Sequence, residues 1–131
     1  MGNRQSTILV VDDNPTNLKL AVSVLGFEGH CVLTATDAQQ AQAVVHNSPP
    51  DLILMDVGLP DMDGLALTQI MKTAEETRHI IIVAVTAFAM KGDEEKAIAA
   101  GCDGYIVKPI DTRKLPGQVA EWLLRKSGGT A

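Results

Sequence analysis

Acidic residues follow two short apolar runs, and this placement is the most informative chemical feature of the sequence. Asp12 and Asp13 follow the run 9–11, and Asp56 follows the run 52–55. Carboxylates held close together repel one another unless a cation or a raised pKa relieves the repulsion. Because oxygen ligands suit hard divalent ions, Mg2+ is the natural cation for such a cluster.

Two further apolar runs lead into Thr86 and Lys108, whose side chains suit phosphoryl chemistry. The lysine ammonium can neutralise phosphoryl oxygens, and the threonine hydroxyl can donate a hydrogen bond to them. A divalent cation would also screen an incoming phosphoryl group from the carboxylates. An ionised Asp56 beside Mg2+ and a lysine is therefore a candidate nucleophile for phosphoryl transfer.

A sheet of alternating strands and helices must position these side chains. The sequence alternates apolar, β-branched runs with helical periodicity about five times, and the expected strands are 7–11, 31–35, 51–55, 79–85 and 104–107. Short, nearly continuous apolar runs are typical of parallel strands covered on both faces. The alternation predicts a right-handed parallel α/β sheet, in which ligands bind at the carboxyl ends of the strands.

The intervening helices carry start and stop signals. Asn14 is expected to cap a helix that begins at Pro15, and Asp37 with Gln40 forms a capping-box pattern. A third helix begins near residue 64, and Gly101 suits a left-handed cap after a fourth.

The start of the fifth helix is ambiguous. Leu115, Val119 and Trp122 have helical spacing, but Pro116 and Gly117 fall in the first turn. Either the helix begins at Pro116 or its opening turn is irregular.

Each polar residue also has an ordinary structural interpretation. Asp13 could cap the first helix, Thr86 could simply end a strand, and Lys108 could be solvated. Asp61 and Asp63 are interpreted as turn or cap residues. The occurrence of five polar residues at matching strand ends nevertheless favours a site.

Composition bounds the class of protein. The length of 131 residues suits one domain, expected over 6–126, with a disordered N-terminus (1–5) and a flexible tail (127–131). A net charge of -5 argues against nucleic-acid binding, and no apolar run is long enough to cross a bilayer. Cys31 and Cys102 lie far apart and outside any metal-binding spacing, which favours a cytoplasmic protein with reduced thiols.

Four segments, in this order and spacing, carry a family resemblance: ILVVDDNPTN, PDLILMDVGLPDMDG, IIVAVTAFAMKGDEE and AAGCDGYIVKPI. From about Ser6 to Arg125 the chain resembles the receiver domain of two-component response regulators. It is most similar to stand-alone regulators of the cell-cycle type and to receivers of hybrid kinases. The resemblance implies a doubly wound (βα)5 fold with five parallel strands in the flavodoxin-like order 2-1-3-4-5.

The resemblance also implies roles for the acidic residues. Asp56 matches the phosphoacceptor, and Asp12 and Asp13 match the acidic pair that holds Mg2+ with it. The backbone carbonyl of Gly58 matches a further metal ligand. The backbone of Val57 matches a contact to the phosphoryl group.

Further matches concern the response to phosphorylation. Thr86 and Tyr105 match the switch pair, in which the aromatic ring turns inward when the hydroxyl moves. The backbone of Ala87 matches a second phosphoryl contact, and Lys108 matches the lysine that pairs with the phosphate. A cis peptide bond is expected before Pro109.

Partners follow from the same resemblance. We expect a single-domain response regulator that takes a phosphoryl group from a sensor histidine kinase or a histidine phosphotransfer protein. A downstream protein would then bind the surface around the fourth helix, fifth strand and fifth helix. Such a regulator catalyses only its own phosphorylation and slow dephosphorylation, and is not an enzyme with an external substrate.

Two departures from the family pattern bear on these expectations. Pro116 and Gly117 put the usual dimer face in doubt, which leaves a monomer or weak dimer. Gly58 and Phe88 occupy positions that tune dephosphorylation, and together they predict a long-lived phosphoryl state.

Alternatives remain open. Haloacid-dehalogenase-type phosphatases use similar groups, but they carry a D-x-D motif after the first strand, where Asp12 and Asp13 are adjacent here. A nucleotide-binding module would need a glycine-rich phosphate loop that the sequence lacks. A receiver fold that acts by contact alone, or a receiver excised from a hybrid kinase, would share the same pattern.

Overall fold

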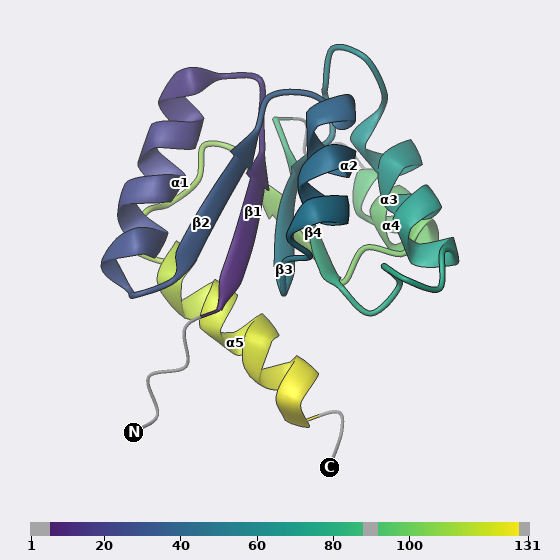
Figure 1. Cartoon of the computed structure of the whole chain (residues 1–131). Coiled ribbons are helices and arrows are strands. Elements are labelled where there is room, and N and C mark those ends of the chain that lie inside the picture. Colours follow the sequence, from purple (N-terminus) through teal and green to yellow (C-terminus); the bar gives the residue numbers. More distant parts are fainter. Residues whose placement is uncertain (1–5, 88–91, 129–131) are drawn as a thin grey trace.

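A computed structural model describes residues 6–87 and 92–128 (Figure 1), and side chains are described up to Arg125. Residues 1–5 and 129–131, most of the two predicted flexible ends, lie outside the described residues. The five strands are all parallel and lie in the order β2-β1-β3-β4-β5, which confirms the predicted fold. Their bounds are Thr7–Val11 (β1), Cys31–Ala35 (β2), Leu52–Asp56 (β3), Ile81–Thr86 (β4) and Gly104–Val107 (β5).

Five helices cover the two faces of this sheet. They are Pro15–Phe27 (α1), Ala38–Asn47 (α2), Gly64–Thr73 (α3), Asp93–Ala100 (α4) and Leu115–Gly128 (α5). Alternate residues of each strand face opposite sides, so one sheet buries two apolar clusters. One cluster joins the sheet to α2, α3 and α4, and the other joins it to α1 and α5. Figure 1 shows these two groups of helices on opposite faces of the sheet. Among these helices none is long and apolar enough to span a membrane.

Two strand boundaries differ from the prediction. β3 covers Leu52–Asp56 rather than 51–55, and its last residue is the predicted phosphoacceptor. β4 covers Ile81–Thr86 rather than 79–85, because the segment before it forms a turn in which the N–H of Ile80 donates to the carbonyl of Thr77. Thr86 pairs with Val107 and is therefore the last residue of the strand, not the residue after it.

The predicted caps of α1 and α4 are present. The side chain of Asn14 accepts hydrogen bonds from the N–H groups of Thr16 (2.8 Å) and Asn17 (3.1 Å), so Asn14, not Asp13, caps α1. Gly101 ends α4 with a φ of 105°.

The predicted capping box of α2 is present in part. The Asp37 side chain accepts from the N–H of Gln40 at 2.7 Å. The Gln40 amide oxygen reaches back to the N–H of Thr36, one residue before the position that a capping box requires.

The opening turn of α5 is regular. The helix begins at Leu115, whose N–H donates to the carbonyl of Asp111, and Gln118 donates to Lys114, both at 3.0 Å. Pro116 lies in the first turn, where its missing N–H leaves no helical bond unmade. The helix therefore starts neither at Pro116 nor irregularly, and the interruption that put the face formed by α4, β5 and α5 in doubt is absent.

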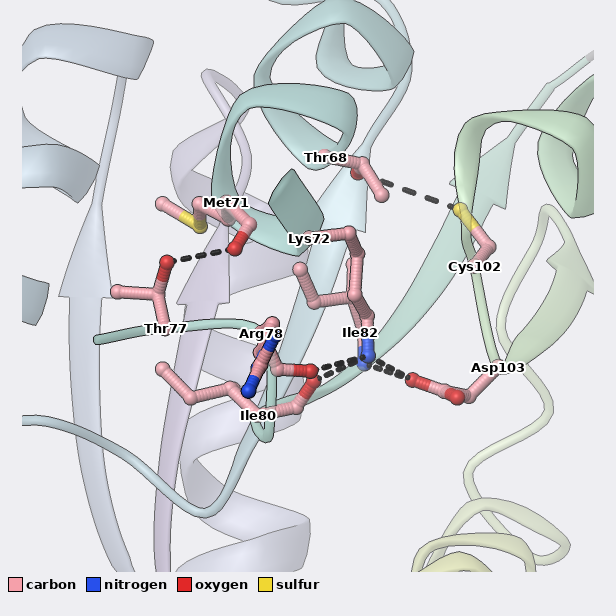
Figure 2. Close-up of polar contacts among 9 residues, drawn as sticks. All are labelled: Thr68, Met71, Lys72, Thr77, Arg78, Ile80, Ile82, Cys102 and Asp103. Atoms are coloured by element: carbon pink, nitrogen blue, oxygen red, sulfur yellow. Dashed lines mark hydrogen bonds and ion pairs between the residues drawn. The ribbon is translucent and has the colours of Figure 1, made fainter. Parts of the chain in front are cut away.

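Lys72 connects three segments at the amino-terminal edge of the sheet (Figure 2). Its Nζ donates to the carbonyl of Ile80 at 2.6 Å, to the carbonyl of Arg78 at 3.3 Å and to the carboxylate of Asp103 at 2.8 Å. Asp103 in turn accepts from the N–H of Ile82 at 2.9 Å. The end of α3, the start of β4 and the turn after α4 are thereby held together.

We expect Lys72→Met to lower the free energy of unfolding by about 1–3 kcal/mol, because two carbonyl groups and a carboxylate lose a charged donor. Arg113→Met is the matched control. Its side chain is 93% exposed and lies 3.8 Å from Asp111, so its loss should change stability by less than about 0.5 kcal/mol. Urea unfolding measures both variants, and equal losses would contradict the role of Lys72.

Candidate functional site

The predicted site residues converge at the carboxyl edge of the sheet. Asp12 follows β1, Asp56 ends β3, Thr86 ends β4 and Lys108 follows β5. β1 and β3 are neighbours, although β2 lies between them in the sequence. The crevice therefore lies at the topological switch point, where open parallel sheets bind ligands.

A buried ion-pair cluster forms the centre of the crevice. The Nζ of Lys108 lies 3.2 Å from Oδ2 of Asp12 and 3.2 Å from Oδ2 of Asp56. Asp12 and Asp56 are 4% and 5% exposed, whereas Asp13 lies at the surface. Ligand atoms of the three aspartates lie within 4.8 Å of one another. This group of carboxylate oxygens fits a hard divalent cation such as Mg2+.

The start of α1 holds Asp12 in place. Its Oδ1 accepts from the N–H of Asn14 at 2.9 Å, and its Oδ2 accepts from the amide of Asn17 at 3.2 Å. The backbone N–H of Asp12 donates to the carbonyl of Ala35 at 3.0 Å. The sequence analysis did not identify Asn17, although its position one turn into the helix capped by Asn14 was available as a signal.

The loop after β3 folds back over Asp56, the predicted phosphoacceptor. The N–H of Gly58 donates to Oδ1 of Asp56 at 3.0 Å, and the N–H of Gly64 donates to the carbonyl of Val57 at 2.9 Å. A Cβ atom on Gly64 would lie only 2.1 Å from the carbonyl oxygen of Asp56. Only a glycine therefore permits this close approach of the two backbone segments.

The two backbone groups predicted to contact phosphate differ in setting. The N–H of Val57 donates to the carbonyl of Val85 at 3.0 Å, so it is engaged with β4 in this structure. Ala87 is exposed directly after Thr86 at the end of β4. The peptide bond between Lys108 and Pro109 is cis, as predicted, and the N–H of Lys108 donates to the carbonyl of Thr86 at 2.7 Å.

A mainly apolar cavity of about 340 Å3 adjoins the site on the side of α4. Thr86 and Tyr105, the predicted switch pair, both line it, together with groups from α4 and the loop after β3. Its lining residues are Val57, Asp63, Leu65, Thr86, Asp93, Lys96, Ala97 and Tyr105.

Comparisons with known proteins agree with this geometry. Residues 8–120 match the family model described as the response regulator receiver domain. The chain belongs to this family. It is 39% identical over 117 residues to the polar-differentiation response regulator DivK of Brucella ovis, a match that covers 89% of this chain and 95% of that protein.

Solved structures of receiver domains show the same fold. A CheY-like response regulator receiver domain from Methanospirillum hungatei superposes with a TM-score of 0.88 at 30% identity, covering 96% of this chain and 99% of that one. The receiver domain of a sensor histidine kinase from Pseudomonas aeruginosa superposes with a TM-score of 0.82 at 33% identity, covering 92% and 98%. That structure has a magnesium ion coordinated in its active site cleft.

Electrostatics of this receiver domain follow from burial of the charged groups. Burial is the main cause that raises the pKa of Asp56, and the charge of Asp12 adds to it. The hydrogen bond from Gly58 and the charge of Lys108 lower the pKa of Asp56 but do not cancel the rise. Burial lowers the pKa of Lys108, yet the two carboxylates together outweigh it and the net shift is upward. The site therefore holds excess negative charge that a cation would stabilise.

The pKa of the Tyr105 phenol is also raised. Partial burial raises the pKa of its phenol first, and the carboxylates of Asp93 and Glu94 on α4 raise it further. The phenol is therefore neutral at physiological pH.

We expect Gly64→Ala to lower the free energy of unfolding by about 3 kcal/mol, because its Cβ would collide with backbone that cannot yield. Gly117→Ala in the first turn of α5 is the control. No atom lies within 4 Å of its added Cβ, so it should stabilise the helix by up to about 1 kcal/mol. Chemical denaturation of both variants checks the contrast, and similar effects of the two would show that the close approach at Gly64 is unimportant.

We expect Asp13→Asn to raise the melting temperature in EDTA, because removing one of three neighbouring charges relieves repulsion of about 0.5 kcal/mol. The same change removes a carboxylate, so added Mg2+ should raise the melting temperature less than in the wild type. Glu76→Gln changes the net charge equally at an exposed position in the turn before β4. Thermal melts with and without Mg2+ test this, and identical responses of the two variants would contradict it.

Proposed function

We propose that this receiver domain accepts a phosphoryl group on Asp56 from a phosphohistidine of a sensor histidine kinase or a histidine phosphotransfer protein. The observation that carries this proposal is the buried Asp56 carboxylate, which lies 3.2 Å from the Lys108 ammonium and beside two further carboxylates. Membership of the receiver family and the similarity to DivK support it.

Mg2+ would be held by the carboxylates of Asp12, Asp13 and Asp56 and by the backbone carbonyl of Gly58. The donor set supports this assignment, because it offers oxygen ligands only and a net negative charge. When bound, the ion neutralises the phosphoryl oxygens during transfer. The magnesium ion in the related Pseudomonas receiver domain gives independent support.

The transfer itself is a displacement at phosphorus. A carboxylate oxygen of Asp56 forms the new P–O bond while the P–N bond to the donor histidine breaks, and the imidazole keeps the electron pair. Lys108, which neutralises Asp12 and Asp56 before the reaction, then pairs with the phosphoryl oxygens. The N–H of Ala87 would also contact these oxygens, and the N–H of Val57 would do so only on leaving the carbonyl of Val85.

The output follows from Thr86 and Tyr105. We propose that the Thr86 hydroxyl moves to the phosphoryl group and that the Tyr105 ring turns into the cavity beside α4. The volume of about 340 Å3 supports this, because both residues already line that cavity. A downstream protein would bind the surface formed by α4, β5 and α5, where Ile98 is 61% and Val107 is 40% exposed.

The lifetime of the phosphoryl group is a further part of the proposal. Gly58 has no side chain that could orient an attacking water, which favours slow dephosphorylation. Phe88, the other residue on which that prediction depends, lies outside the described residues.

We propose a cytoplasmic regulator, monomeric or weakly dimeric, that binds proteins rather than nucleic acid.

Intact mass measurement with acetyl phosphate tests the proposal. We expect one phosphoryl adduct on the wild type that requires Mg2+, and none on Asp56→Asn, because the amide cannot form the acyl phosphate. Asp37→Asn, a carboxylate at the start of α2, should be phosphorylated like the wild type. A folded wild type that gains no adduct under any condition would indicate a receiver fold that acts by contact alone.

A further inference from the structure

Asp61 connects the loop after β3 to a helix that is distant in the sequence. Its carboxylate accepts hydrogen bonds from the N–H groups of Ala38 (2.9 Å) and Gln39 (3.1 Å), the first two residues of α2. The Ala38 N–H is the main cause that holds the pKa of Asp61 below its ordinary value. Asp61 is therefore ionised and accepts both bonds at neutral pH.

This contact is separate from the cap that α2 makes for itself. Asp37 accepts from Gln40, and Gln40 accepts from Thr36, so residues 36–40 are already ordered by local bonds. Asp61 satisfies two N–H groups that these local bonds leave over. Its distinctive effect is to link the loop after β3 to the start of α2.

The same stretch of chain also holds the other side of the metal cluster. The carbonyl of Ala35, three residues before α2, accepts from the N–H of Asp12 at 3.0 Å. Residues 35–39 thus bond Asp12 on one side and the loop that carries Gly58 on the other. The N–H of Gly58 bonds back to Asp56 at the end of β3, whereas the hydrogen bonds of Asp61 join the same loop to α2.

We propose that Asp61 is a positioning residue, which holds the Gly58 loop at a set distance from Asp12 and Asp13 and so sets the affinity for Mg2+. This inference rests on the proposed function, because it assigns the Gly58 carbonyl to the metal. Without Asp61, the loop would keep the buried Leu59 side chain as an anchor but lose its polar tie to α2. The carboxylate pair and the carbonyl would then be less well preorganised for one ion.

Asp61→Ala and Asp37→Ala form a matched pair for the test. Each removes a carboxylate that accepts from the first turn of α2, and each should lower the melting temperature in EDTA. Only Asp61→Ala should raise the dissociation constant for Mg2+ measured by calorimetry, by about tenfold, the low end of effects known for groups behind metal ligands. Asp61→Asn retains one acceptor oxygen and should lie between Asp61→Ala and the wild type.

Phosphorylation by acetyl phosphate completes the test. The rate for Asp61→Ala should fall in proportion to Mg2+ occupancy at low Mg2+ and recover at saturating Mg2+. If Asp61→Ala binds Mg2+ like the wild type, or if Asp37→Ala weakens binding equally, the inference is wrong and Asp61 is only a helix cap. A wild type that is never phosphorylated would refute the proposed function instead, and Asp61→Asn keeps the test valid if the alanine variant does not fold.

Discussion

The burial of negative charge at the carboxyl edge of the sheet is the constraint on which the rest of this structure depends. Asp12 and Asp56 are almost fully buried, and one lysine lies 3.2 Å from both. Burial and mutual repulsion raise the pKa of Asp56, so its ionised form is held at a cost to folding. Two apolar clusters, one on each face of the sheet, supply the stability that tolerates this arrangement.

Backbone N–H groups hold the buried carboxylates in place. Gly64 lets the loop after β3 pass against the carbonyl of Asp56, and the N–H of Gly58 is thereby directed at the carboxylate. Asp12 is held in a similar way by the first turn of α1. Backbone N–H groups, together with the side chains of Asn17 and Lys108, thus orient the two carboxylates and limit their freedom before any ligand arrives.

The two edges of the sheet differ in their construction. At the amino-terminal edge, Lys72 binds three segments through one ammonium group, which fixes the end of α3 relative to β4 and the turn after α4. At the carboxyl edge, a cavity separates Thr86 and Tyr105 from full packing against α4. This cavity leaves room for local rearrangement of Thr86 and Tyr105 without loss of the sheet.

The strand order was predictable from the family resemblance. The helix caps at Asn14, Asp37 and Gly101 and the acidic cluster were predictable from the residues themselves, because they depend on local chemistry and on residues at strand ends. How distant segments meet depends instead on tertiary packing. Periodicity could not place the ends of β3 and β4 to the residue, since pairing with neighbouring strands sets them. The Val57 N–H bond to β4 and the Asp61 hydrogen bonds to α2 likewise join groups whose proximity no local pattern encodes.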